Sequence, residues 1–155
     1  MVMEYTIESM LNLFERHAPD ICHGDLSFAA DEPFVGAQSQ QAPNGSTVIT
    51  LNIIEGGINE MSPSHRHIDI FLLEPHRELG AHFHQHATAH VYGIDGCGTA
   101  MIGQQCIALG RLDKAIFPAG VVHNVITGES HFLFASFQDH PIIQVDGSLD
   151  YFVAE

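Results

Sequence analysis

Histidine is the residue type that stands out in this chain, with 12 copies against five lysines and arginines together. In the densest stretch, His82, His84 and His86 occupy every second position, and His90 has the same parity. Alternate residues of a β-strand share one face, so a strand here would present several imidazoles side by side. Buried imidazoles without partners destabilise a fold, whereas a divalent cation binds their nitrogen lone pairs. The spacing therefore predicts a metal site.

A further candidate ligand, His123, follows a turn signal downstream. Pro118 and Gly120 favour a tight turn, and His123 comes three residues after the glycine. A strand that returns from this turn would bring one more imidazole to the same point of the interior. No Ser-His-Asp order, glycine-rich phosphate loop or paired-carboxylate motif accompanies these histidines, so metal chemistry is the favoured reading.

The elements that must position these histidines are short strands. After Gly45 the chain consists of short apolar runs, each closed by turn residues, which is typical of an antiparallel sandwich or barrel. No second helix is long enough for a crossover between parallel strands. We therefore predict an all-β fold. The expected strands cover residues 47–55, 67–74, 80–86, 88–94, 99–102, 105–108, 115–117, 121–127, 131–137 and 142–145.

The chain before these strands has a different character. Apolar residues recur at helical spacing over residues 5–17, with Thr6 as a plausible N-cap and Pro19 expected to end the helix. Residues 20–45 are irregular, with one short strand expected around residues 26–29.

In that irregular stretch, Gln38, Gln40 and Gln41 suggest a solvated loop. We expect a single domain, in which a short N-terminal helix and an irregular arm (residues 1–45) precede a β-barrel (residues 46–155).

Two motifs in the barrel region resemble those of the cupin superfamily. The first cupin motif contains HxH, three or four residues, an acidic ligand and a glycine turn. The second contains G, several residues, PxG, two residues and H. The resemblance covers roughly residues 73–128. It rests on His84-x-His86-xxx-His90 followed by Asp95-Gly96, and on Gly110 through Pro118-x-Gly120 to His123.

The first motif departs from the common form because His90 stands where most cupins have glutamate. Some small cupins carry such an all-histidine set. The resemblance implies a double-stranded β-helix, or jelly-roll barrel, that holds one divalent transition metal through His84, His86, His90 and His123. It also implies a homodimer formed by exchange of N-terminal strands. We expect Fe, Mn, Zn or Ni, in that order.

The register of the first motif has alternatives. His82 and His84 could instead be the ligand pair, with His86 in the bend and no fourth ligand, since the spacing to the glycine turn fits Ala89 slightly better than His90. A degenerate barrel without a metal is the third possibility. His123 is a ligand in both metal-binding alternatives.

The resemblance and the ligand types together predict a metal-dependent enzyme acting on a small organic molecule. Dioxygenase-like oxidation is the first expectation, and isomerase or lyase chemistry is the second. Tyr92 and His82 are candidate catalytic residues, as hydrogen-bond donors or general acid–base groups. The alternative is a non-catalytic module that binds or senses a metal or a small ligand, because a fold alone does not decide function.

Composition excludes several partner classes. Nineteen acidic residues against five basic ones give a net charge of −14, which repels nucleic acid and anionic membranes. No apolar run approaches the roughly 18 residues of a membrane span, and no signal peptide is visible, so a cytoplasmic location is expected. Three cysteines without a CxxC pair predict reduced thiols.

Overall fold

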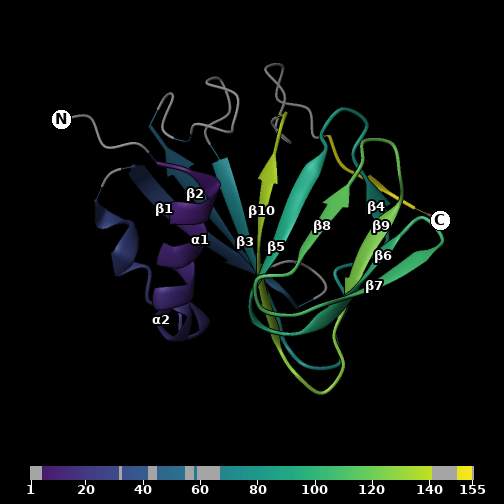
Figure 1. Cartoon of the computed structure of the whole chain (residues 1–155), viewed down its shortest axis with the longest axis horizontal. Helices are drawn as coiled ribbons and strands as arrows, with labels where there is room; N and C mark the ends of the chain where they lie inside the picture. Colours follow the sequence, from purple (N-terminus) through teal and green to yellow (C-terminus); the bar gives the residue numbers. More distant parts are fainter. Residues whose placement is uncertain are drawn as a thin grey trace.

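Two antiparallel sheets form the body of the protein (Figure 1). The computed structural model describes residues 5–31, 33–41, 45–54, 58, 67–140 and 150–154. Within these residues, the first sheet has the order β1-β2-β3-β10-β5-β8 and the second has the order β11-β4-β9-β6-β7. The first sheet consists of β1 (Phe34–Gln41), β2 (Thr47–Ile53), β3 (His67–Leu73), β5 (Ala89–Gly96), β8 (Lys114–Phe117) and β10 (Phe132–Gln138). The second consists of β4 (His82–Phe83), β6 (Gly98–Ile102), β7 (Gln105–Leu109), β9 (His123–Ile126) and β11 (Phe152–Val153).

The predicted all-β class is confirmed. Each strand expected after Gly45 within the described residues is present, although the one at 80–86 is reduced to β4, because the chain bends after Phe83. The strand expected at 142–145 lies outside the described residues. Residues from both sheets, such as Val91 and Phe134 of the first and Val125 of the second, share one buried cluster, so the sheets pack face to face.

The predicted N-terminal helix is present as α1 (Ile7–Arg16). Thr6 is its N-cap: the hydroxyl of Thr6 accepts the backbone N–H of Ser9 at 3.0 Å, and the Ser9 hydroxyl accepts the backbone N–H of Thr6 at 2.8 Å. This reciprocal pair is a capping box, which satisfies two N–H groups that a helix start leaves free. Pro19 does not end the helical region but lies in the first turn of α2 (Ala18–Cys22), where a missing N–H costs nothing.

Two local expectations for the N-terminal arm were wrong. Residues 26–29 do not form a strand; the chain there forms a 3-10 helix, η1 (Ser27–Ala30). The glutamines expected in a loop belong to β1, which pairs with β2 from Phe34 to Gln41. Backbone hydrogen bonds hold this end strand, so its exposed glutamines need no apolar pattern.

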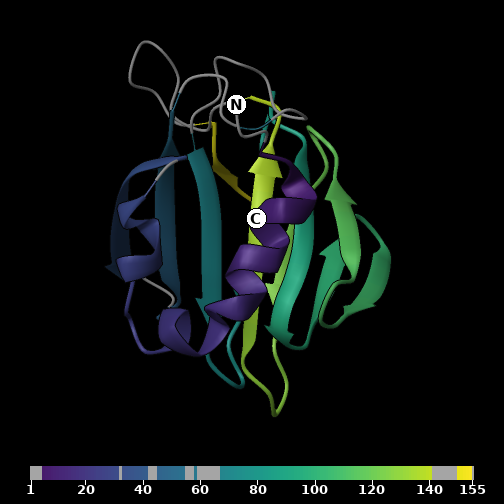
Figure 2. The same ribbon diagram turned by 60° about the vertical axis from the view of Figure 1, so that its left-hand side comes forward.

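Helix α1 lies across the outer face of the first sheet (Figure 2). Its buried residues Met10 and Phe14 belong to the same core cluster as Ile70 and Phe137, which point outward from β3 and β10. The two faces of this sheet are therefore distinct: odd and even residues alternate between the helix and the barrel interior. No helix among the described residues is long and apolar enough to cross a membrane.

Candidate metal centre

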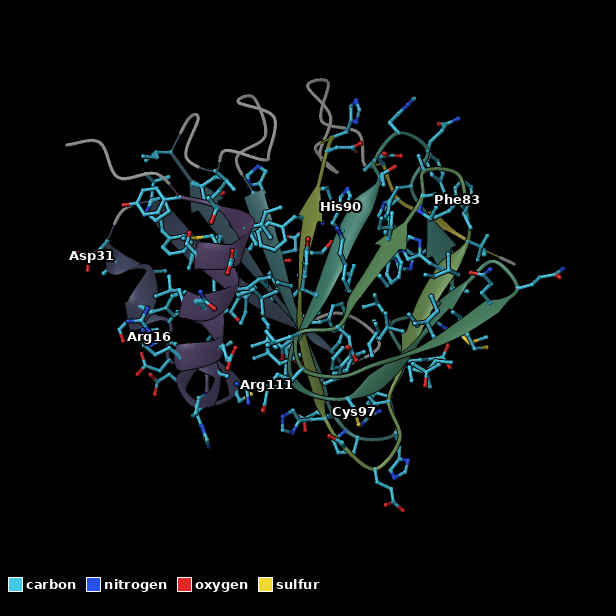
Figure 3. The ribbon with its side chains drawn as sticks, viewed as in Figure 1. Arg16, Asp31, Phe83, His90, Cys97 and Arg111 are labelled. Carbon is cyan, nitrogen blue, oxygen red and sulfur yellow. The ribbon has the colours of Figure 1, made fainter. Side chains whose placement is uncertain are left out.

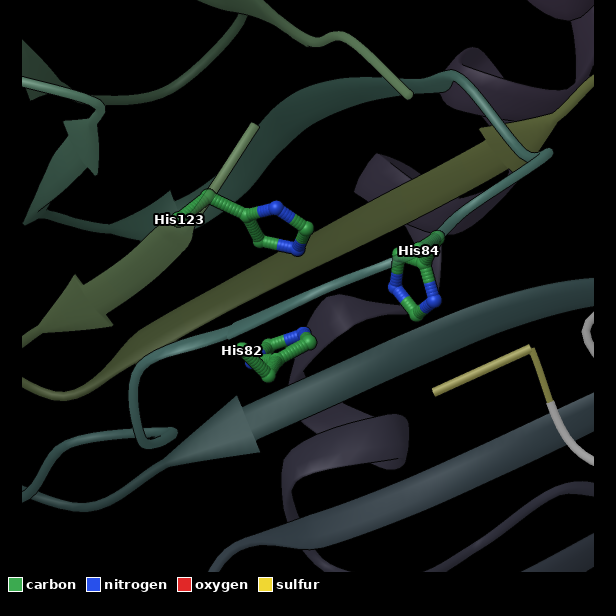
Figure 4. A group of neighbouring side chains, drawn as sticks. All are labelled: His82, His84 and His123. Atoms are coloured by element: carbon green, nitrogen blue, oxygen red, sulfur yellow. The ribbon is translucent and has the colours of Figure 1, made fainter. Parts of the chain in front are cut away.

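Three histidines meet inside the barrel where the two predicted motifs face each other (Figure 4). His82 on β4 and His123 on β9 are directly opposed in the antiparallel pairing. Their ring centroids lie 4.2 Å apart, and the ring of His84 lies 5.2 Å from each. One ligand nitrogen of each histidine lies within 4.8 Å of the others. The pairing of β4 with β9 thus brings two of the rings together, and the residue that follows β4 places the third beside them.

Backbone carbonyl groups orient all three imidazole rings through the same atom, Nδ1. The Nδ1 atom of His82 is 2.6 Å from the Gly80 carbonyl oxygen, and that of His123 is 3.2 Å from the Val121 carbonyl oxygen. The Nδ1 of His84 contacts the carbonyl oxygen of Asp150. A ring that donates its Nδ1–H to a carbonyl keeps the lone pair on Nε2. Each histidine therefore offers Nε2 as a ligand atom.

The turn at Pro118 and Gly120 in the second motif is tied to the segment that carries His84. Gly120 donates its backbone N–H to the carbonyl oxygen of His84 at 2.6 Å. Gly120 has a φ of 78°, a left-handed conformation that favours glycine. The PxG turn that begins at Pro118 thus anchors the start of β9 against the bend after β4.

Asp150 braces the bend that carries His84. Its carboxylate accepts the backbone N–H groups of Gln85, His86 and Ala87. Burial acts to raise the pKa of this carboxyl, but the three N–H donors outweigh it, so the pKa of Asp150 lies below its usual value. The charged carboxylate therefore holds the loop from the far end of the chain.

Burial favours the neutral form of two of these three histidines. His82, His84 and His123 are 4%, 8% and 3% exposed. Burial, followed by the nearby His82, lowers the pKa of His123 to about 3. Burial also lowers the pKa of His82, with the backbone hydrogen bond to Gly80 acting in the opposite direction. Neutral imidazole is the form that binds a metal, so these residues fit a divalent transition metal with nitrogen ligands.

A cavity of about 670 Å³ opens in front of the three histidines. Its wall is mostly apolar. Phe117 stacks on His123 with ring centroids 4.5 Å apart, and Tyr151 stacks on His82 at 4.6 Å. The residues that line the cavity are Gln40, Gln41, Val48, Asp69, Phe71, Leu79, His82, His84, Ala89, Val91, Phe117, His123, Phe134, Ser136, Gln138, Tyr151 and Val153.

The four-histidine set predicted from the sequence is not brought together. His84 and His123 lie in the cluster, but His86 is exposed in the bend. His90 is on β5 and lines a groove beside α1 on the outer side of the sheet (Figure 3). Tyr92, the predicted catalytic tyrosine, lines the same groove. The Lys114 ammonium nitrogen lies 5.4 Å from the centroid of its ring. His82, the other predicted catalytic residue, is a member of the cluster.

The physical reason is the parity of β5. Ala89 and Val91 point into the cavity, so His90 and Tyr92 must point to α1. The sequence prediction assumes that every second residue from His84 to His90 faces the same side. Residues 84–88 form a bend and not a strand, so this alternation does not hold there. The alternative register, with His82 and His84 as the pair and His86 in the bend, agrees with this arrangement.

A second set of potential metal donors lies outside the barrel. Cys22, Asp95 and His131 each place one donor atom within 4.8 Å of the other two. His131 Nε2 lies 2.8 Å from an Asp95 carboxylate oxygen. The cysteines, free as expected, are partly buried at position 22 and exposed at 97 and 106. Burial and the Asp95 charge raise the pKa of the Cys22 thiol. This set must be controlled for in any metal measurement.

Comparison with known proteins places the fold. No family profile and no curated sequence matches the chain. Solved structures do match, among them a cupin-2 domain protein from Rhodospirillum rubrum, with a TM-score of 0.55 and 18% identity over 68% of this chain and 70% of that one. The chain has the cupin fold.

Two other matching structures belong to named enzymes. The polyketide cyclase RemF from Streptomyces resistomycificus has a TM-score of 0.50 and 15% identity, covering 66% of this chain and 72% of that one. Oxalate decarboxylase from Lactobacillus farciminis, in a formate complex, has a TM-score of 0.58 and 11% identity, covering 75% of this chain and 33% of that one. At these identities the likeness shows the fold alone.

Some site residues had no signal in the sequence. Asp150 and Tyr151 come from the last described segment, which carries no recognisable motif. Three polar residues line the cavity because they lie on the inward face of the first sheet: Asp69, Ser136 and Gln138. Only the pairing of the strands shows that these positions face the histidines.

Proposed function

We propose that this cupin barrel is a metal-dependent enzyme that acts on a small organic molecule. The metal would be one divalent transition metal held by His82, His84 and His123. The observation that supports this proposal most is that three buried histidines have their Nδ1 atoms on backbone carbonyls and their rings at one point of a cavity. Backbone partners of this kind are typical of metal-binding histidines.

This ligand set replaces two of the four residues that the sequence favoured. His86 and His90 lie outside the cluster, and Ala89 stands on β5 at the inward position nearest to His90. With three neutral ligands, a divalent ion would keep its full positive charge and have open positions for oxygen ligands. Such an ion supplies Lewis acidity and, when it is iron, redox chemistry with dioxygen.

The chain's own residues contribute orientation and a dry environment. The carbonyls at Gly80, Val121 and Asp150 fix the imidazoles before any ligand arrives. Phe117 and Tyr151 stack on two of the rings, and the three histidines are at most 8% exposed, so little water reaches them. We propose dioxygenase-like oxidation of an uncharged small molecule as the first activity to test, with isomerase or lyase chemistry second. The two enzymes of this fold named above differ in chemistry, so the fold does not choose among these reactions.

Metal content of the purified protein tests the ligand set. Elemental analysis should find about one transition metal per chain at the barrel site. His123→Ala and His82→Ala should each lose most of it, since a buried site with two ligands binds a divalent ion far more weakly. His90→Ala is the matched control and should keep the metal. Loss of the metal in His90→Ala with retention in His82→Ala would contradict the proposed set.

The measurement needs one further control. Cys22→Ser removes a donor from the outer Cys22, Asp95 and His131 group, so metal that survives in this variant and is lost on His123→Ala belongs to the barrel. If Cys22→Ser binds no metal after reconstitution while the wild type does, the barrel site is not the metal centre. Circular dichroism of each variant confirms that the fold is intact.

Dioxygen uptake tests the activity. The iron-loaded protein is given a panel of 1,2- and 1,3-dioxygenated compounds. Consumption of dioxygen that disappears in His123→Ala supports an oxidation. Tight binding of a compound without turnover would instead support the non-catalytic binding module, which is the alternative function.

A further inference from the structure

A polar group interrupts the apolar wall that the first sheet contributes to the cavity. Asp69 on β3 and Ser136 and Gln138 on β10 all line the cavity. They share the inward face with Phe71 and Phe134, because alternate residues of a strand point to the same side. None of them belongs to the histidine cluster. Polar side chains on an otherwise apolar wall set the orientation of a ligand.

The amide of Gln138 is held in one orientation by its neighbours. Its Nε2 atom donates to Ser136 Oγ at 2.8 Å and to Asp69 Oδ2 at 3.2 Å. An amide nitrogen has two hydrogens, so both are used. The hydroxyl of Thr50 donates to the other oxygen of Asp69 at 3.2 Å, which fixes the carboxyl group in turn.

The same network leaves the amide oxygen of Gln138 as an acceptor. Gln138 is 5% exposed, and its Oε1 atom is buried without a hydrogen-bond partner among the residues that the structure describes. A buried acceptor is stabilised when a donor reaches it. The nitrogen side of the amide is bonded to Ser136 and Asp69, so the oxygen is the polar atom that this lining residue has left for a ligand.

We propose that Gln138 is a specificity-determining residue that accepts a hydrogen bond from a neutral O–H or N–H group of the molecule in the cavity. The inference deepens the proposed function, since it assigns a second recognition point in the cavity in front of the histidines. Asp69 and Ser136 are positioning residues, which act by holding the amide.

The chemistry of the wall defines the class of ligand. An acceptor oxygen beside the Asp69 carboxyl disfavours a carboxylate or a phosphate at this point. The rest of the lining favours an apolar or aromatic body. The ligand class is therefore a small, largely apolar molecule with a hydroxyl or N–H group, such as a phenol.

The test uses the chelator-treated protein and two matched probes. p-Cresol carries a donor O–H, whereas 4-methylanisole has the same ring and an oxygen without a hydrogen. Titration followed by NMR should show that the wild type binds p-cresol roughly threefold to tenfold more tightly, the gain of one ordinary hydrogen bond. Gln138→Met keeps the length of the side chain and should abolish the preference.

Two further variants separate recognition from structure. Gln41→Met makes the same substitution at another glutamine of the cavity lining, whose amide donates to the Thr47 hydroxyl, and should keep the preference. Ser136→Ala removes one acceptor from the Gln138 amide. It should reduce the preference for p-cresol without changing the affinity for 4-methylanisole, a split that a general loss of structure would not produce.

Equal affinity of the wild type for the two probes, no binding of either, or an unchanged preference in Gln138→Met would each overturn the inference. The measurement is made without metal, so its result does not depend on the metal analysis. If the protein binds p-cresol more tightly than 4-methylanisole but holds no metal, the proposed function is contradicted and the role of Gln138 is still supported.

Discussion

At the scale of single residues, burial prepares the histidines for their proposed role. His123 and His82 are almost fully enclosed and remain neutral because a charged imidazole would lose its hydration there. Their Nδ1–H groups satisfy carbonyls, which avoids an unpaired donor. The cost is that the folded state binds protons at these sites more weakly than the unfolded chain does.

This cost predicts how stability depends on pH. Below pH 6.5 the unfolded chain takes up protons at His82 and His123, whereas the folded chain takes up a proton at His123 only near pH 3. The free energy of unfolding of the metal-free protein should therefore fall as the pH drops. His123 alone should contribute about 2 kcal/mol of this loss between pH 7 and pH 5.

Urea unfolding of chelator-treated protein at pH 7, 6 and 5 measures this dependence. Histidines titrate across this window, and comparison with a variant that lacks His123 isolates the contribution of that residue. His123→Gln should flatten the curve by about that amount. A slope that is the same in the wild type and in this variant would show that His123 is not kept neutral by the fold.

At the scale of elements, β5 separates the helix from the cavity, and its position depends on a close approach. The turn after β7 packs on Gly93: the backbone N–H of Gly93 donates to the Asp113 carbonyl oxygen, and the N–H of Leu112 donates to the Gly93 carbonyl oxygen, both at 2.9 Å. Arg111 in the same turn contacts Glu15 of α1. The turn thus joins β5, which carries His90 outward, to the helix above it.

Substitution of Gly93 should be severe. A Cβ atom there would lie 2.0 Å from the Gly110 carbonyl oxygen, which is backbone and cannot rotate away. Gly93→Ala should therefore destabilise the protein by more than about 3 kcal/mol in chemical denaturation. Gly128→Ala, where a Cβ meets nothing within 4 Å, is the matched control and should change stability by no more than about 1 kcal/mol. Similar losses in both variants would contradict the close approach.

At the scale of the whole molecule, charge is the dominant feature. A net charge of −14 on 155 residues makes the folded chain repel itself more strongly than the expanded chain does. This charge also supports the proposal of an uncharged ligand, because it gives anionic partners no general attraction. The homodimer and the cytoplasmic location remain predictions, and sedimentation analysis tests the former.

Salt should therefore stabilise the protein at neutral pH. Raising the KCl concentration from roughly 0.02 M to roughly 0.5 M shortens the screening length and weakens the repulsion between carboxylates. The melting temperature should rise by a few degrees. The same change at pH 5, close to the sequence isoelectric point of about 5.0, should have little effect, since the net charge is then small. A melting temperature that falls with salt at pH 7 would contradict this prediction.

The sequence alone was enough for the fold class, the N-terminal helix and the role of His123 as a candidate ligand. These depend on local information: alternating apolar residues and turn residues define strands, and a PxG turn before a histidine is visible within a few positions. The polar strand β1 could not be found in this way, because the backbone of β2 pairs with it and its glutamines are solvated.

Tertiary structure decided which histidines meet. Parity within one strand is a local property, but parity across the bend from His84 to His90 depends on how β4 and β5 leave that bend for different sheets. The pairing of β4 with β9 places His82 beside His123, and the pairing of β5 with β10 turns His90 outward to α1. The inward position of Gln138 has the same origin, because hydrogen bonds between strands far apart in the chain determine which side of a sheet faces the cavity.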